Sequence, residues 1–276
     1  MKIITTNSVF PYDYPVDKGI ERLAAIGFDG VDIAIDYCSM DKNGPFNSDK
    51  WQDWAKSLKE KSEELGIELT HSHACGNAAA RGEQFLKGIE LCGILDIPYT
   101  VVHPIHQKAD GSFFEDEEEF IKINSEAIKP ILEVAEKNNV IVLSENILWG
   151  ASKIPECISA LVSEVNSPYF GWCYDTGHTN CLGIGFDTLK LVKNVPLSLH
   201  IQDNTGAYGK DDHMMPGDGN IDWNGFLGVL KEIGYKGEFV LEAHHQSLEA
   251  KDCERDGILK EILNRSRKMV DYYNTL

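Results

Sequence analysis

The stretch from Gly171 to Asn180, which reads GWCYDTGHTN, joins an aromatic run to residues that can do chemistry. Phe170 to Tyr174 is typical of a buried strand, and Asp175 and His178 follow where the strand gives way to a glycine loop. A carboxylate and an imidazole at this spacing suit a divalent metal such as Mn²⁺ or Zn²⁺. Asp175 could equally cap the next turn, with His178 at the surface. The ends of other strands must decide between these interpretations.

Strand-like and helix-like patterns alternate along the whole chain. We expect strands at 3–6, 31–35, 67–70, 99–102, 140–143, 170–174, 197–199 and 237–241. Helical patterns separate them, at about 15–26, 48–65, 79–95, 114–138, 154–165, 186–192 and 222–233, and a charged helix closes the chain. Such alternation indicates βαβ units and a parallel sheet. We therefore predict one domain over residues 1–276, an α/β fold that is a single (β/α)₈ TIM barrel. A doubly wound open sheet is the alternative, weakened by the absence of a GxGxxG turn after the first strand.

Six successive expected strands end in residues that can bind a metal. In a barrel the carboxyl ends of the strands converge on one face, which carries the active site. These residues are His71 or His73, His103, Glu145, Asp175, His200 and Glu242. A lone histidine or glutamate at a strand end is usually structural, but six in succession indicate a site. Glu145, Asp175, His200 and Glu242 form an oxygen-rich set that predicts one divalent metal, Mn²⁺ first, with Mg²⁺, Co²⁺ or Zn²⁺ as alternatives.

Glu145 and Glu242 lie on expected strands five and eight, nearly opposite each other around a barrel. Two such carboxylates can remove a proton from one carbon of a metal-held substrate and deliver it elsewhere. The metal would polarise the carbonyl and stabilise the enediolate that forms. This chemistry predicts an aldose–ketose isomerase or an epimerase, with Glu145 and Glu242 as the catalytic residues. The same enediolate can expel a leaving group, so a keto-sugar dehydratase or lyase is the first alternative.

The motifs resemble those of the xylose isomerase-like barrels, which include sugar epimerases, inosose isomerases and dehydratases, and endonuclease IV. The resemblance covers nearly the whole chain and rests on VLSEN, DTGH, LHIQDN, PGDGNIDW and VLEAH. It implies that Glu145, Asp175, His200 and Glu242 bind the metal, that the two glutamates act as acid and base, and that His178 is the imidazole beside the metal. Ketose 3-epimerases carry an arginine shortly after the seventh-strand histidine, where this chain has Asp203, Asn204 and Thr205. This departure argues against a simple ketohexose epimerase.

Resemblance to endonuclease IV implies a second alternative, a zinc phosphodiesterase with three metals. Its additional ligands would correspond to His73 or His71, His103, and Asp211 with His213. The net charge of −18 and the presence of only five arginines argue against a nucleic-acid partner, and against an anionic membrane as well. A third alternative is a non-catalytic sugar-binding barrel, which would not need two opposed glutamates.

We expect the partner to be a small-molecule carbohydrate held by side chains around the metal. His213 lies in the loop GKDDHMMPGDGNIDW, which is expected to fold over the pocket, and it either bonds a substrate hydroxyl or braces the loop. Phe10, Tyr12 and Trp149 follow strands one and five, where their rings could stack on a sugar or belong to the wall or core. The expected substrate-binding set is His178, His103, His73, His213, Trp149 and Phe10.

The rest of the composition bears on location. The seven cysteines are scattered without a CxxC pair, which favours reduced thiols and a cytoplasmic protein. The N-terminal residues lack the pattern of a secretory leader, and no apolar run approaches the roughly 18 residues that span a bilayer. The sequence leaves open whether the chain forms a homo-oligomer.

Overall fold

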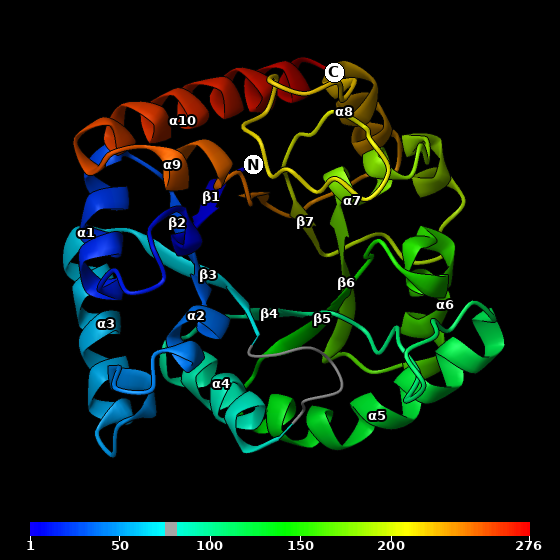
Figure 1. The fold of residues 1–276 in the computed structure, drawn as a ribbon, viewed down its shortest axis with the longest axis horizontal. Helices are drawn as coiled ribbons and strands as arrows, with labels where there is room; N and C mark the ends of the chain where they lie inside the picture. Colours follow the sequence, from blue (N-terminus) through cyan, green and yellow to red (C-terminus); the bar gives the residue numbers. More distant parts are fainter. Residues whose placement is uncertain (75–81) are drawn as a thin grey trace.

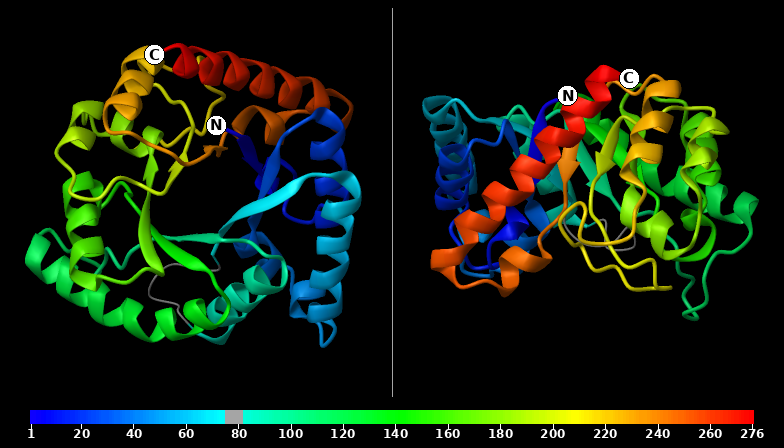
Figure 2. Two further views of the ribbon diagram at one scale, coloured as in Figure 1. Left: turned by 180° about the vertical axis from the view of Figure 1, so that it is seen from behind. Right: turned by 90° about the horizontal axis from the view of Figure 1, so that it is seen from above.

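Eight parallel strands form a barrel in the computed structural model, which describes residues 1–74 and 82–276 (Figures 1 and 2). The strands are β1 Ile3–Thr6, β2 Gly30–Ala34, β3 Glu68–His73, β4 Tyr99–Val102, β5 Ile141–Glu145, β6 Phe170–Asp175, β7 Ser198–His200 and β8 Phe239–Leu241. Neighbouring strands pair in sequence order, and β8 pairs with β1. A parallel bridge between Ile201 and Leu241 joins β7 to β8. The predicted (β/α)₈ barrel is confirmed.

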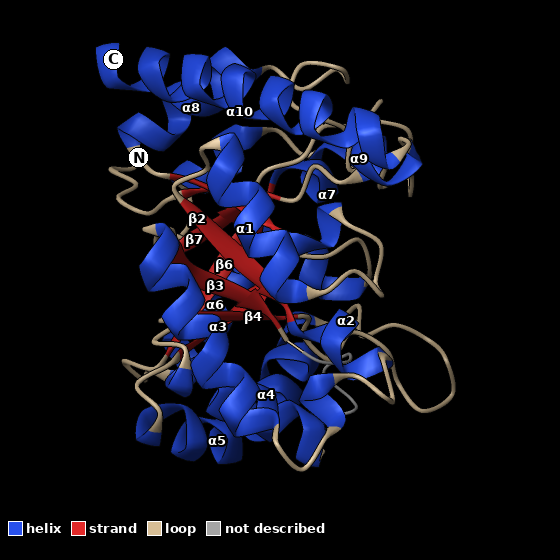
Figure 3. Cartoon of the chain, turned by 90° about the vertical axis from the view of Figure 1, so that its left-hand side faces the viewer, coloured by secondary structure: helices blue, strands red, loops and turns tan. Residues whose placement is uncertain are grey.

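Helices surround the strands on the outside of the barrel (Figure 3). The longer ones are α1 Val16–Ile26, α3 Trp51–Leu65, α4 Glu83–Ile94, α5 Glu117–Lys137, α6 Pro155–Val165, α8 Trp223–Glu232 and α10 Asp252–Thr275. The shorter ones are α2 Ile35–Met40, α7 Thr176–Cys181 and α9 His245–Glu249, with 3₁₀ turns η1 Asn7–Val9, η2 Pro45–Asn47, η4 Gly150–Lys153 and η5 Phe186–Lys190. Among the described residues no helix is long and apolar enough to cross a membrane. The start of the helix expected at 79–95 lies outside the described residues.

Three local expectations differ from the structure. The segment after β6 is the short helix α7 rather than a glycine loop, because Asp175 caps it by accepting a hydrogen bond from the amide of His178 at 2.6 Å. Strand β2 continues directly into α2, and the helix expected at 186–192 is the 3₁₀ turn η5. The helix expected at 222–233 is α8, which Asp222 caps by accepting a hydrogen bond from the amide of Gly225 at 3.1 Å.

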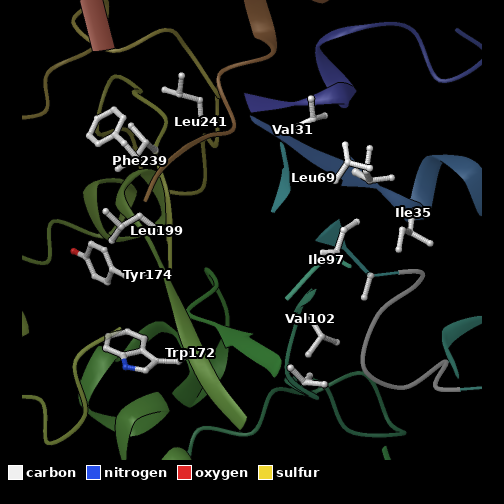
Figure 4. Close-up of a cluster of buried hydrophobic side chains, with 14 of the residues drawn as sticks. Val31, Ile35, Leu69, Ile97, Val102, Trp172, Tyr174, Leu199, Phe239 and Leu241 are labelled. Carbon is white, nitrogen blue, oxygen red and sulfur yellow. The ribbon is translucent and has the colours of Figure 1, made fainter. Parts of the chain in front are cut away.

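The alternation of side chains along the strands positions the site. Outward residues such as Trp172, Tyr174 and Leu199 belong to the large hydrophobic core, part of which is drawn in Figure 4. A separate small cluster of Val101, Leu143 and Cys173 is fully buried. Because side chains of a strand alternate between its two faces, the residues two positions after Leu143 and Cys173 share their face. These residues are Glu145 and Asp175, which therefore point into the barrel above an apolar floor.

Candidate active site

The four expected metal ligands come together at the carboxyl ends of β5 to β8. Each offers one ligand atom, and these atoms all lie within 4.8 Å of one another. The side chains of Glu145, Asp175 and His200 are almost fully buried, and that of Glu242 is 13% exposed. Nδ1 of His200 lies 3.0 Å from Oε1 of Glu145 and 3.4 Å from Oε2 of Glu242. Glu145 and Glu242, which are far apart in the sequence, thus lie beside the same imidazole nitrogen of His200.

The donor atoms fit a divalent cation. Oδ2 of Asp175 is buried with no hydrogen-bond partner in the part of the chain that the structure describes. An ionised oxygen without a partner is costly to bury, and a cation removes that cost. Three carboxylates and one imidazole form a set that suits Mn²⁺ and related divalent ions.

The pKa of Glu145 is shifted in the opposite direction from the pKa values of Asp175 and Glu242. Burial opposes ionisation of Glu145, but the imidazoles of His200 and His103 outweigh it and hold its pKa well below the usual range. Burial raises the pKa of Asp175 and of Glu242, and the negative charge of Glu145 adds to both shifts. A bound cation would lower both pKa values, because it favours the ionised form of a carboxyl group.

A second group of possible ligands shares Glu145 with the first. His73, His103 and Glu145 each offer an atom within 4.8 Å of the others. Oε2 of Glu145 lies 3.3 Å from Nε2 of His103 and 3.8 Å from Nε2 of His73. Burial lowers the pKa of His73 to about 3, so this imidazole is neutral and can bind a metal. His71 does not join this group but lies deeper, with Nδ1 2.9 Å from Oγ1 of Thr70.

Asp211 links two further histidines on the other side of the site. Its Oδ2 lies 3.1 Å from Nε2 of His178 and 2.9 Å from Nε2 of His213. Nδ1 of His213 lies 2.9 Å from the backbone oxygen of Glu242, which ties the loop after β7 to the end of β8. Burial opposes protonation of His213, but Asp211 and Glu242 raise its pKa to about 9. The loop after β7 therefore reaches the site as expected.

A pocket of about 210 Å³, which we call the site pocket, lies among these groups. Of the four expected ligands, Glu145 and Glu242 line it, whereas Asp175 and His200 do not. It is lined by Thr6, Ser8, Ala34, Asp36, Tyr37, His73, His103, Glu145, His178, Asp211, His213, Glu242 and His244. Four of the expected substrate-binding residues, His73, His103, His178 and His213, are among them.

Two expected substrate-binding residues do not line the site pocket. Phe10 is only 2% exposed, and its ring stacks on Tyr14 with centroids 4.7 Å apart. Trp149 is 38% exposed and stacks on Phe113 at 5.4 Å. Both rings are engaged by neighbouring aromatic side chains, and the geometry lends no support to the prediction that they bind substrate.

Asp36, Tyr37 and His244 line the site pocket but were not expected there. Asp36 and Tyr37 follow β2, a strand without an expected ligand at its end. His244 stands two residues after Glu242, a spacing that could have revealed it, and its ring stacks on His213 with centroids 4.3 Å apart. These residues add a phenol, a carboxylate and an imidazole to the wall.

Comparison with known proteins identifies the family. Residues 20–269 match the family model described as xylose isomerase-like TIM barrel. The chain belongs to this family. The match spans all the residues of the two ligand groups, from His73 to Glu242.

Relatives within the xylose isomerase-like family are similar over part of their length. An uncharacterized protein of Methanocaldococcus jannaschii is 31% identical over 175 residues, which are 61% of this chain and 57% of that protein. An inosose isomerase of Bacillus velezensis is 24% identical over 159 residues, which are 55% of each. The chain spans about half the length of the curated relatives it matches.

Solved structures share the fold over nearly the whole chain. The IOLI protein with a zinc atom aligns with a TM-score of 0.76 at 19% identity, covering 100% of this chain and 99% of that one. A D-tagatose 3-epimerase-like protein aligns with a TM-score of 0.72 at 24% identity, covering 98% and 100%. At these identities the likeness shows the family barrel.

Proposed function

We propose that the protein is a metal-dependent isomerase or epimerase of a small sugar or cyclitol, working by proton transfer through an enediolate. The observation that carries this proposal is the convergence of Glu145 and Glu242 on Nδ1 of His200, at 3.0 and 3.4 Å. Two carboxylates from the ends of β5 and β8 thus lie beside a single position. The names of the inosose isomerase relative and the D-tagatose 3-epimerase-like neighbour support the substrate class.

Glu145, Asp175, His200 and Glu242 would hold the divalent metal, with Mn²⁺ as our first choice and Mg²⁺, Co²⁺ or Zn²⁺ as alternatives. When bound, the metal polarises the substrate carbonyl and lowers the cost of the negative charge on the enediolate. One glutamate removes the proton beside the carbonyl, and the other returns a proton to the substrate. The imidazoles of His178 and His213 line the other side of the site pocket, where both rings are held by Asp211.

The proposal is tested by hydrogen exchange in D₂O. Ketoses, inososes and 3-keto-glycosides are incubated with metal-loaded and metal-stripped protein, and loss of the proton beside the carbonyl is followed by NMR. We expect exchange with at least one of these substrates that depends on metal. The same spectra separate an isomerase or epimerase from a dehydratase or lyase, because elimination yields an unsaturated product. Absence of exchange from every substrate in the metal-loaded protein would reject the proposal.

A zinc phosphodiesterase remains a second candidate because of one specific observation. His73 and His103 form a further ligand group with Glu145, and Asp211 joins His178 to His213. These groups have the composition of additional metal positions. The net charge of −18 is unfavourable for a DNA substrate. Metal stoichiometry discriminates: one ion per chain supports the isomerase, and three zinc ions support the phosphodiesterase.

We also propose that the protein acts in the cytoplasm. The seven scattered cysteines support this location, since no spacing among them suggests a disulfide framework.

A further inference from the structure

A second pocket lies beside the site pocket, between the loop after β1 and the segment around α2. It has a volume of about 220 Å³, and we call it the outer pocket. Five aromatic rings contribute to its lining, those of Tyr12, Tyr14, Tyr37, Phe46 and Trp54. Tyr12 is 61% exposed and stands at the surface, whereas Phe46 is fully buried. The pocket is therefore a recess with an aromatic wall that opens to solvent.

The outer pocket and the site pocket share a wall. Tyr37 lines both of them, and its neighbour Asp36 lines the site pocket. In the same way Asn7 lines the outer pocket and its neighbour Ser8 lines the site pocket. Oδ1 of Asn7 accepts a hydrogen bond from the buried amide of Ala34 at 2.6 Å, which ties this wall to β2. A molecule that fills the site pocket and extends past Tyr37 would enter the outer pocket.

The polar lining of the outer pocket is acidic. Asp13, Asp17 and Asp41 contribute carboxylates, and none of its lining residues, all of them described, is lysine or arginine. Arg22 contacts the hydroxyl of Tyr14 at 3.4 Å, but its guanidinium is bound to Asp252 at 2.6 Å. An anionic occupant such as a phosphate would therefore find no cation in this pocket and would be repelled.

Two of the three carboxylates of the outer pocket already have a partner within the protein. Oδ1 of Asp41 accepts a hydrogen bond from the amide of Asn43 at 3.1 Å, and a carboxylate oxygen of Asp17 lies 3.9 Å from Nζ of Lys18. The remaining carboxylate oxygens can accept hydrogen bonds from hydroxyl groups. Aromatic faces beside a few polar acceptors are the usual lining of a small-molecule site. A neutral ring that carries several hydroxyl groups matches both the rings and the carboxylates.

We propose that the outer pocket binds a second, neutral sugar ring, so that the substrate is a keto-sugar carrying a glycosidic substituent. This inference rests on the function proposed above. The reacting ring then carries its carbonyl on a carbon other than the anomeric one, because the anomeric carbon forms the glycosidic bond. Glu145 or Glu242 takes the hydrogen beside the carbonyl as a proton, and the electron pair of the broken C–H bond enters the enediolate. Return of a proton to carbon forms the product, and the glycosidic bond stays intact.

A binding experiment tests the pocket without any turnover. Metal-loaded protein is titrated with methyl glucoside and with cellobiose, which carry no keto group, and affinities are measured by saturation-transfer NMR and calorimetry. We expect cellobiose to bind about tenfold more tightly, and Tyr12→Ala to reduce that preference by roughly three- to tenfold, the usual contribution of one aromatic contact. Tyr12→Phe keeps the ring and should keep the preference. Tyr272→Ala, at a tyrosine that is 40% exposed on α10, is the matched control and should change nothing.

Several results would overturn the inference. They are equal affinity for the two probes, a preference that survives Tyr12→Ala, and a stronger preference for 2-aminoethyl glucoside, which would assign the pocket to an ammonium group. Kinetics with the 3-keto forms of both probes separate this inference from the proposed function. Turnover of both keto-sugars at equal kcat/KM rejects the outer pocket alone. A cellobiose preference in binding, without exchange or turnover of any keto-sugar, supports the outer pocket and rejects the isomerase.

Discussion

Oδ1 of Asp175 accepts a hydrogen bond from the backbone amide of His178 at 2.6 Å, while Oδ2 of the same carboxylate is buried with no partner among the described residues. The first oxygen caps α7, and the second is available to the proposed metal. The sequence left two roles open for Asp175, that of helix cap and that of metal ligand. The structure assigns the cap to one oxygen, so the two roles do not compete.

Substitutions at Asp175 should separate its two roles. Asp175→Asn keeps an oxygen that can cap α7 but removes the negative charge, so we expect metal occupancy to fall while the metal-free protein keeps its stability. Asp175→Ala should lose metal as well, and should also lower the free energy of unfolding by about 1 kcal/mol through loss of the cap. Elemental analysis measures the metal, and urea unfolding of metal-free protein measures the stability.

Asp222→Ala is the matched control for the cap. Asp222 caps α8, and its carboxylate is not part of either ligand group. We expect a similar loss of stability with full retention of metal. His200→Ala should show the opposite pattern, with loss of metal from a folded barrel. Full metal occupancy in both Asp175→Asn and His200→Ala would reject the ligand assignment.

Asp32 on β2 should make the stability of the metal-free protein depend on pH. Its carboxylate is fully buried, both oxygens lack partners among the described residues, and burial raises its pKa to about 7. Between about pH 4 and pH 7 the folded protein keeps a proton that the unfolded chain has lost, so stability falls as pH rises through this range. Asp32→Asn should therefore be more stable than the unmodified protein at pH 8, by up to about 4 kcal/mol.

Urea unfolding of both metal-free proteins at pH 5 and pH 8 checks this expectation. The advantage of Asp32→Asn should shrink at pH 5, where the unmodified carboxyl group is mostly protonated. Glu60→Gln makes the same chemical change at an exposed position of α3 and should have little effect at either pH. An Asp32→Asn protein that is less stable than the original at pH 8 would show that the buried carboxylate is stabilised by contacts that an amide cannot make.

The barrel and the four proposed ligands could be predicted because both follow from local patterns. Short β-branched runs alternating with helical segments specify a (β/α)₈ barrel. A period of two residues then places Glu145 and Asp175 on the same face as the apolar residues Leu143 and Cys173. The carboxyl ends of the strands in such a barrel converge regardless of the conformation of the loops. The residues at those ends could therefore be assigned to one site from the sequence.

The remaining wall of the site pocket depends on loops, which local patterns specify poorly. The position of an aromatic residue after a strand does not determine where its side chain points. Phe10, for example, points into the core and packs against Tyr14 and Arg22. Asp36 and Tyr37 were missed because β2 continues into a helix with no glycine or proline to mark the boundary. Their place in the wall follows from the packing of α2 over the barrel end.

A phosphate group on the substrate should weaken binding rather than strengthen it. None of the residues lining the site pocket, all within the described part of the chain, is lysine or arginine. Lys108 is paired with Glu119 at 2.6 Å, and Arg81 lies outside the described residues. We expect a sugar 6-phosphate to bind more weakly than the parent sugar, because its charge meets several carboxylates. The imidazole of His213, whose pKa is raised to about 9, is already paired with Asp211. Calorimetry with each pair of compounds at low and moderate salt measures the difference, and tighter binding of the phosphate would contradict the expectation.

Glu145 and Glu242 should each be needed for proton transfer, in different steps. Glu145→Gln and Glu242→Gln keep the shape of the side chain and one oxygen for the metal, but an amide cannot accept the proton. We expect turnover to fall at least ~10²-fold in each variant, which is the usual contribution of a positioned acid or base. Initial rates at saturating metal measure the loss, with metal content determined on the same samples.

The two variants should differ in hydrogen exchange, which identifies the role of each glutamate. If one glutamate removes the proton and the other returns it, the variant that lacks only the donor still exchanges substrate hydrogen with D₂O but forms no product. The variant that lacks the acceptor shows neither exchange nor product. We expect one of the two variants to retain exchange, and that variant identifies the glutamate that returns the proton. Near-normal turnover of either variant with metal bound would show that the glutamate concerned is only a ligand.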